Sequence, residues 1–191
     1  MILVHKLSDQ FSNCAILTID TSIKPTKQIK SDNYLFFVDE NNKVNSINVF
    51  NNESLLNSSN KAFFALDEQE SLKIKKIAHD LNLQINDGKK FVYAQIIKRN
   101  VHPKSDKLFV LTLFDNSKEF QVVTNTLDSI QGKIVAVALP GSINANGLEI
   151  LDGSMLDVKS NGMLIGYASL GLQDQGLVFG DEKNIGEEVI F

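Results

Sequence analysis

The sequence predicts two folding units: a small α+β unit, then a small barrel or sandwich of β-strands. Three observations support this: one long amphipathic helix pattern closes the first half, short strand-like segments precede it, and closely spaced strands with Gly-rich turns fill the second half. The turn sequence Asn-Asp-Gly at 86–88 separates the halves, because glycine readily adopts a positive φ. We therefore expect two domains, residues 1–88 and residues 89–191.

The helix of the first half is expected over residues 67–83. Asp67 and Glu70 have the Asp-x-x-Glu spacing of a capping box. Apolar residues then recur on one helical face, at Ile74, Ile77, Ala78, Leu81 and Ile85. This unit is the only part of the chain where we predict a long helix.

Four short apolar segments ahead of the helix predict strands of an antiparallel sheet. They are residues 2–5, 14–20, 34–38 and 44–50. The Asp-Glu-Asn-Asn sequence at 39–42 indicates a hairpin between the last two, and the Asn/Ser-rich residues 51–60 indicate a loop. A sheet with one long helix defines the α+β class predicted for the first domain.

The second half has strand-like segments at short intervals. They are residues 91–101, 107–114, 119–124, 134–139, 148–155, and 178 with 189–191. Turn sequences containing Pro, Gly or Asn separate them. About a hundred residues of this kind are typical of a small barrel or sandwich.

Catalysis and metal binding find no support in the sequence. Its three histidines have no zinc-ligand spacing, and there is neither a Gly-x-Ser-x-Gly elbow nor a phosphate-binding Gly-x-x-x-x-Gly-Lys loop. The one cysteine, Cys14, excludes an internal disulfide and fits a reducing compartment. No apolar run reaches the about 18 residues of a membrane span. We expect a non-enzymatic cytoplasmic protein without catalytic residues, cofactor, metal or membrane association.

Positive charge is concentrated in one segment of an acidic chain. The formal net charge is −4, from 19 basic and 23 acidic residues, which argues against binding nucleic acid by bulk attraction. Residues 89–107 nevertheless hold five lysines and the only arginine, Arg99, against the single acid Asp106. Pro103 makes the connection within this segment a stiff bend. Charge alone leaves two interpretations open, a phosphate cradle or a barrel corner with solvated lysines.

Two short segments resemble the signatures of the tRNA-binding domain family. Val-His-Pro-Lys-Ser-Asp-Lys-Leu at 101–108 is similar to its His-Pro-x-Ala-Asp-Lys-Leu signature, and Ser-Asn-Gly-Met at 160–163 is similar to its Ser-x-Gly-Met stretch. Further similar segments are residues 132–138, Gly141, 170–172 and 176–177. The family's oligonucleotide-binding barrel, an OB-fold, occurs in the phenylalanyl-tRNA synthetase beta subunit, in some methionyl-tRNA synthetases and in stand-alone YtpR-like proteins. With its short preceding domain, the chain is most similar to the stand-alone proteins.

The resemblance implies that residues 89–191 form an all-β OB-fold that binds tRNA or structured RNA in translation without catalysis. Cations would bind phosphates, and polar groups would contact sugars or bases. The candidate RNA-binding residues are Lys98, Arg99, Asn100, His102, Lys104, Lys107, Asn125, Ser160, Asn161 and Met163. For His102, base stacking and a hydrogen bond to the backbone of the turn stay open. For Met163, RNA contact and a place in the core stay open.

Two aromatic residues also have open roles. Phe109 and Phe114 lie on one predicted strand, and their spacing places them on opposite faces of it. One of them is a candidate stacking platform for a base, and core packing is the alternative for each.

One departure from the family favours an alternative function. Residues 122–127 read Val-Val-Thr-Asn-Thr-Leu where family members carry a Gly-Ala pair. With the acidic net charge, this favours a protein-interaction or dimerisation module that docks on a tRNA synthetase and has lost RNA binding. The apolar tail 171–191 must pack on its own barrel or on a second copy, and we expect a weak homodimer.

Overall fold

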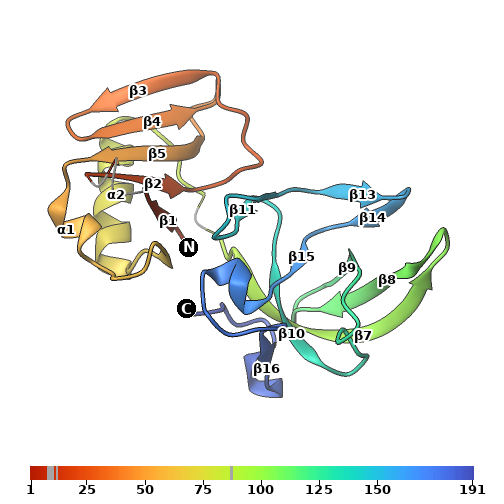
Figure 1. The fold of residues 1–191 in the computed structure, drawn as a ribbon. Helices are drawn as coiled ribbons and strands as arrows, with labels where there is room; N and C mark the ends of the chain where they lie inside the picture. Colours follow the sequence, from red (N-terminus) through yellow and green to blue (C-terminus); the bar gives the residue numbers. More distant parts are fainter. Residues whose placement is uncertain (8–10, 12, 87) are drawn as a thin grey trace. The chain divides into compact units, whose positions relative to one another are not determined.

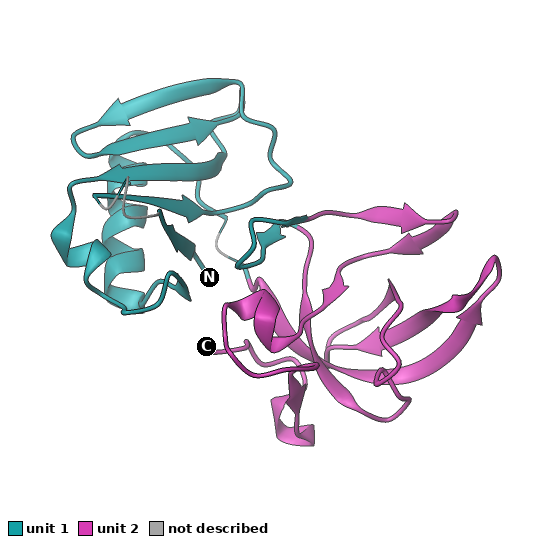
Figure 2. Ribbon diagram, in the orientation of Figure 1, with its two compact units in different colours: residues 1–88, 141–149, 191 teal, residues 89–140, 150–190 magenta. Residues whose placement is uncertain are grey.

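The computed structural model describes residues 1–7, 11, 13–86 and 88–191. These residues form two compact units (Figure 2). Unit 1 contains residues 1–88, 141–149 and Phe191, and unit 2 contains residues 89–140 and 150–190. Unit 1 is therefore not one continuous stretch of chain, because it includes a segment from the second half of the sequence.

Unit 1 is built on a six-stranded antiparallel sheet with the strand order β3-β4-β5-β2-β1-β6 (Figure 1). Its strands are β1 (Leu3–Lys6), β2 (Cys14–Thr18), β3 (Lys27–Ser31), β4 (Tyr34–Val38), β5 (Val44–Phe50) and β6 (Phe63–Ala65). Two helices accompany it, α1 (Glu53–Leu56) and α2 (Glu68–Asp80). The predicted hairpin is confirmed: Asp39 Oδ1 accepts hydrogen bonds from the backbone N–H groups of Asn41 and Lys43 between β4 and β5.

Helix α2 begins as its sequence predicts. Asp67 is the N-cap, and its side chain accepts a hydrogen bond of 2.8 Å from the N–H of Glu70. The helix ends at Asp80, short of the expected residue 83, because the chain turns into the left-handed region at Asn82 with φ of 56°. Ile74 and Ala78 are buried against the apolar residues of the sheet, so the helix packs through its predicted apolar face.

Unit 2 contains a five-stranded sheet with the order β15-β10-β7-β8-β9, and β16 also pairs with β10. The strands are β7 (Phe91–His102), β8 (Ser105–Phe114), β9 (Glu119–Thr124), β10 (Ile134–Ala138), β15 (Met163–Leu164) and β16 (Phe179–Gly180). A short pair in unit 2 is β13 (Gly153–Met155) with β14 (Val158–Ser160). A second short pair is β11 (Ser142–Ile143), which belongs to unit 1, with β12 (Glu149–Ile150) at the boundary of the two units. Single 3-10 turns follow at η2 (Tyr167–Leu170) and η3 (Glu182–Asn184).

The predicted fold class, an α+β domain followed by an OB-fold barrel, is wrong. The described chain is mostly β, and its only α-helices are one of 13 residues and one of 4. The first unit has more strand than expected because β3 and β6 were not anticipated: β3 has one apolar residue among five, and β6 has only three residues. In unit 2 the sheet is open, because the edge strands β15 and β9 do not pair with each other.

The core of unit 2 lies on one face of the β7–β8–β9 sheet. Its buried residues include Ile96, Leu111, Leu113, Val122 and Val135.

Among the described residues, no helix is long and apolar enough to cross a membrane.

Candidate nucleic-acid interface

The first signature forms the tight turn between β7 and β8. Pro103 and Lys104 connect His102 to Ser105, which are paired across the hairpin. His102 is 3% exposed. Its Nδ1 accepts a 3.1 Å hydrogen bond from the N–H of Lys104, so the ring proton is on Nε2, which lies 3.0 Å from the carbonyl oxygen of Met155. Of the two roles left open, the structure shows the hydrogen bond to the backbone of the turn.

The β13–β14 hairpin is held against this turn. Besides the bond from His102 to Met155, Lys104 Nζ lies 2.5 Å from Asp157 Oδ2 at the hairpin tip. Both partners of this ion pair are exposed, and such pairs contribute about 0–1 kcal/mol. An acid therefore accompanies Lys104, one of the predicted phosphate-binding cations.

The second signature fastens β14 to the edge of β9. Ser160 Oγ accepts a 3.0 Å hydrogen bond from the N–H of Val123 and donates one of 3.2 Å to the carbonyl of Gly162. The N–H of Asn161 donates to the carbonyl of Gln121 at 2.7 Å, and Asn161 Nδ2 donates to Asp152 at 2.6 Å. The predicted RNA-binding side chains of Ser160 and Asn161 are thus hydrogen-bonded within the protein.

The glycine of the second signature is required by backbone contact. Gly162 has φ of 135°, and a Cβ at this position would lie 2.5 Å from the carbonyl oxygen of Ala138. Met163 follows in β15, where it pairs with Ala138 and is half-buried. The signature thus places β15 beside β10.

The three consecutive candidates on β7 do not share a face. Lys98 pairs with Thr112 and Asn100 with Val110, whereas Arg99 pairs with the core residue Leu111. Lys98 and Asn100 are exposed on the face opposite to the core, and Arg99 is half-buried at the end of the core face. The sheet therefore does not present these cations on one common face, as a simple phosphate cradle would require.

The two aromatic candidates lie on opposite faces of β8, as predicted. Phe109 is on the core face and only 8% exposed, and the Cζ of Arg99 lies 3.5 Å from its ring centroid. Phe114 is half-buried and pairs with Gln95 on the other side. Lys107 and Asn125 are exposed, with no side-chain partner among the residues that the structure describes.

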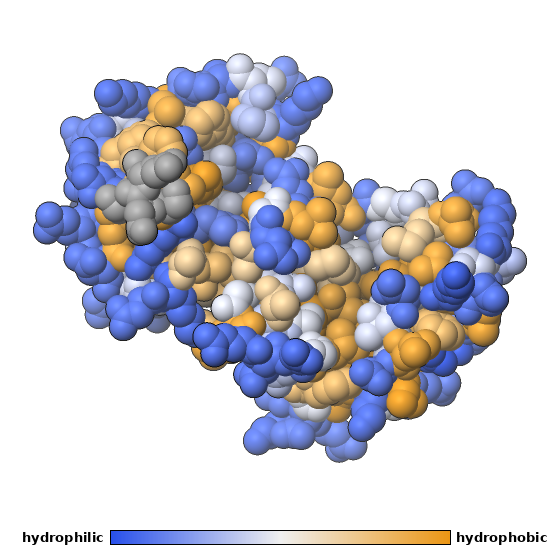
Figure 3. All heavy atoms as spheres, viewed as in Figure 1, coloured by the Kyte–Doolittle hydropathy of each residue, from blue (hydrophilic) through white to orange (hydrophobic). Residues whose placement is uncertain are grey.

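Sequence reasoning missed the partners of the signature residues. Asp152, Met155 and Asp157 come from the β13–β14 segment, and Gln121 comes from β9. At the hairpin tip, Leu156 and Asp157 adopt positive φ of 47° and 67°, a conformation seen only in the structure. Apolar side chains are exposed around this region, including Val101, Leu151, Met155 and Leu156. Figure 3 shows apolar side chains at the surface of unit 2, interspersed with hydrophilic ones.

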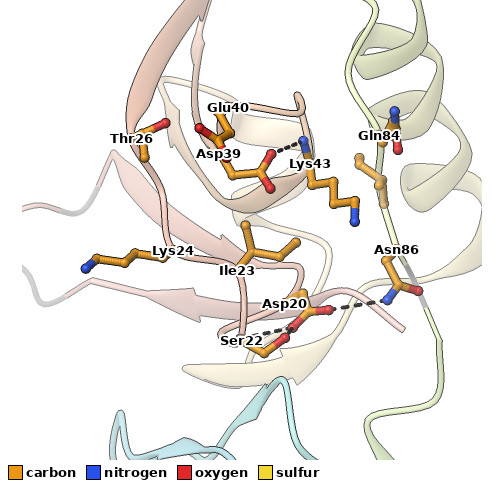
Figure 4. A pocket seen from close by; sticks show the side chains of 11 residues that line it. Asp20, Ser22, Ile23, Lys24, Thr26, Asp39, Glu40, Lys43, Gln84 and Asn86 are labelled. Carbon is orange, nitrogen blue, oxygen red and sulfur yellow. Dashed lines mark hydrogen bonds between the residues drawn. The ribbon is translucent and has the colours of Figure 1, made fainter.

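Unit 1 has a polar cleft of about 860 Å³ (Figure 4). The carboxylate of Asp20, which lines the cleft, accepts hydrogen bonds from Ser22 and Asn86. Three carboxylates line the cleft, against two lysines, Lys24 and Lys43. This balance disfavours a polyanion in the cleft, whereas the candidate RNA-binding residues all lie in unit 2. Within the described residues, no group of three His, Cys, Asp or Glu side chains could hold a metal ion.

An antiparallel β-domain with both signatures at its strand ends defines the class, a tRNA-binding domain. The family model described as "Putative tRNA binding domain" matches residues 91–187, and the chain belongs to this family.

The chain is also similar to individual known proteins. The chain is 28% identical over 142 residues to the "Putative tRNA-binding protein YtpR" of Bacillus subtilis, with 72% of this chain and 71% of that protein covered. It is 33% identical over 106 residues to the phenylalanine–tRNA ligase beta subunit of Chlamydia caviae, covering 50% of this chain and only 13% of the subunit. A solved MetRS-related protein from Pyrococcus horikoshii aligns with a TM-score of 0.41 at 19% identity, over 65% of this chain and 97% of that one.

Proposed function

We propose that residues 89–191 bind tRNA or structured RNA without catalysis, as an accessory to translation in the cytoplasm. The observation that supports this most directly is the family match, which covers residues 91–187. The proposal assigns no function to residues 1–88.

The cations available for phosphate contact are fewer than the sequence alone indicates. Lys98 and Lys107 are exposed and have no ion pair within the described part of the chain, and Arg99 has a cation–π partner but no acid. Lys104 would have to exchange Asp157 for a phosphate. We therefore expect about three or four phosphate contacts, with Asn100 and Asn125 as the accessible polar side chains.

His102, Ser160, Asn161 and Met163 take an indirect part in this proposal. Their hydrogen bonds and strand pairing hold β13, β14 and β15 in place. We propose that they shape the binding surface and do not touch RNA.

The decisive experiment is a titration of the full chain with total tRNA across a salt series. The logarithm of the affinity should fall linearly with the logarithm of salt, with a slope of about −2 to −4 for three or four phosphates. Absence of any binding at low salt would contradict the proposal. The protein-interaction module on a tRNA synthetase, with or without a weak homodimer, would then be the function to test.

A further inference from the structure

A β-bulge determines the direction of the Arg99 side chain. The register between β7 and β8 shifts between Ile96, which faces Leu113, and Lys98, which faces Thr112. Strict alternation after Ile96 would turn residue 98 toward the core, but the extra residue turns Arg99 there instead. The only arginine of the chain therefore lies at the end of an apolar core, on the face that holds Leu111 and Phe109.

The guanidinium of Arg99 is held without an acceptor. It lies on the ring of Phe109, with Cζ 3.5 Å from the ring centroid. Its Nε is buried and has no hydrogen-bond partner among the described residues. The two Nη groups have no partner there either, and unlike Nε they are not buried. The buried Nε without an acceptor costs free energy of the same order as the stack on Phe109 contributes, so folding alone does not favour an arginine over an apolar residue here.

Residues near the Arg99–Phe109 stack are exposed where strands β7 and β9 end. Val101, which pairs with Phe109, is 61% exposed. Thr124 pairs with Phe109 from β9, and the exposed Asn125 follows it directly. Two of the predicted RNA-binding residues, Arg99 and Asn125, thus lie at the same end of the sheet.

We propose that the Arg99–Phe109 stack is a binding site for one nucleotide of RNA, whose paired acceptor atoms bind the two Nη groups. This inference rests on the proposed function and gives Arg99 a role distinct from that of the exposed lysines. The planar guanidinium presents its donors as a fork that matches two adjacent acceptors, which an ammonium group cannot do. Two parts of a nucleotide offer such a pair: the phosphate oxygens, and the O6 and N7 atoms of guanine.

The test compares Arg99→Lys and Arg99→Leu with wild type in titrations of the full chain with total tRNA. We expect Arg99→Lys, which keeps the charge, to lose at least about fivefold in affinity, as expected for one bidentate contact. Arg99→Leu should lose at least as much affinity while unfolding at the same or a higher urea concentration, because it removes the unpartnered buried Nε. The matched control is Lys133→Leu, which removes the cation of another cation–π pair in unit 2, with Phe179, and should change affinity less than twofold.

The two possible acceptors are distinguished with short single-stranded RNAs containing guanosine or 7-deazaguanosine, which lacks N7. If guanine is the acceptor, wild type should prefer guanosine and Arg99→Lys should lose the preference; if phosphate is the acceptor, neither protein should discriminate. If wild type binds tRNA and Arg99→Lys binds it with the same affinity, the inference is overturned and the proposed function stands. The inference is also overturned if Arg99→Leu unfolds at a lower urea concentration than wild type, because Arg99 would then serve the stability of the fold. Failure of wild type to bind any RNA would overturn the proposed function itself.

Discussion

The polar signature residues and the exposed lysines in and beside the first signature behave differently in the structure. His102, Ser160 and Asn161 use their polar side chains for hydrogen bonds to the protein itself. Lys98, which precedes the first signature, and Lys107, which lies within it, have no ion pair among the described residues. The difference supports the proposal that the hydrogen-bonded signature residues preserve the architecture and that exposed lysines contact RNA. This comparison can be tested by separating losses of stability from losses of affinity.

The largest effect is expected at Gly162. Gly162→Ala should lower the free energy of unfolding by about 3–4 kcal/mol, because the Cβ would meet the carbonyl oxygen of Ala138 at 2.5 Å and φ is 135°. Urea denaturation monitored by circular dichroism measures this. Gly153→Ala is the control: its Cβ meets nothing within 4 Å, and the change should be below about 0.5 kcal/mol. Equal stability of the two variants would show that the close approach at Gly162 is not a constraint.

His102→Ala should cost about 2–3 kcal/mol of unfolding free energy. It removes the bond to the carbonyl of Met155 and leaves the N–H of Lys104 without its acceptor. The control is His79→Ala, since the His79 side chain is 90% exposed on α2. If instead His102→Ala kept full stability and lost tRNA binding, His102 would contact RNA directly.

The lysines should give the opposite result. Lys98→Gln and Lys107→Gln should each change stability by less than about 0.5 kcal/mol, because both side chains are exposed. Each should lower tRNA affinity at low salt and reduce the salt slope by about 1. Titrations with tRNA and with urea on the same protein preparations measure the change in affinity and the change in stability of each variant. A salt slope identical to wild type in both variants would exclude these lysines from the interface.

The smallest effect is expected from His5 in unit 1, and it depends on pH. Burial lowers the pKa of His5 below 6.5, although hydrogen bonds of its ring to the backbone of Asn144 and Ala145 oppose the shift. The unfolded chain therefore binds a proton more readily than the folded one. The contribution of His5 to stability is complete above pH 6.5 and declines as the pH falls through 6.5 toward the folded pKa. The urea midpoints at pH 7.5 and at pH 5.5 should differ less for His5→Gln than for wild type. An equal difference in both proteins would show that His5 does not contribute to the pH dependence of stability.

Much of the strand arrangement could be predicted from local patterns. Residues 34–38 and 44–50 are strands as expected, and the strand expected over 14–20 ends at Thr18; the apolar residues of these segments are frequent enough to mark a buried face. Strand β3 escaped prediction because an edge strand needs little apolar surface, and Ile29 is its only apolar residue. The open sheet was also not predictable, since strand closure depends on pairing between segments distant in sequence.

The candidate site was predictable in residue type more than in geometry. The charge count located the cations, and alternation along a strand indicates that Lys98 and Arg99 face opposite sides. Which of the two faces the core depends on the bulge after Ile96, and no sequence pattern marks that bulge. The partner of Ser160, the N–H of Val123, lies 37 positions away, so its hydrogen bond could not be inferred from local sequence.

The discontinuous composition of unit 1 has a consequence for how the chain is made. Thr21 donates hydrogen bonds to the carbonyls of Gly141 and Ser142, each of 3.1 Å, and His5 is bonded to the carbonyl of Asn144. The ring of Phe63 stacks on that of the last residue, Phe191, with centroids 5.4 Å apart. During synthesis from the N-terminus, residues 1–88 leave the ribosome long before these partners exist. Unit 1 therefore acquires these contacts only after residues 141–149 and Phe191 have been synthesised, and a fragment ending at residue 88 would lack them permanently.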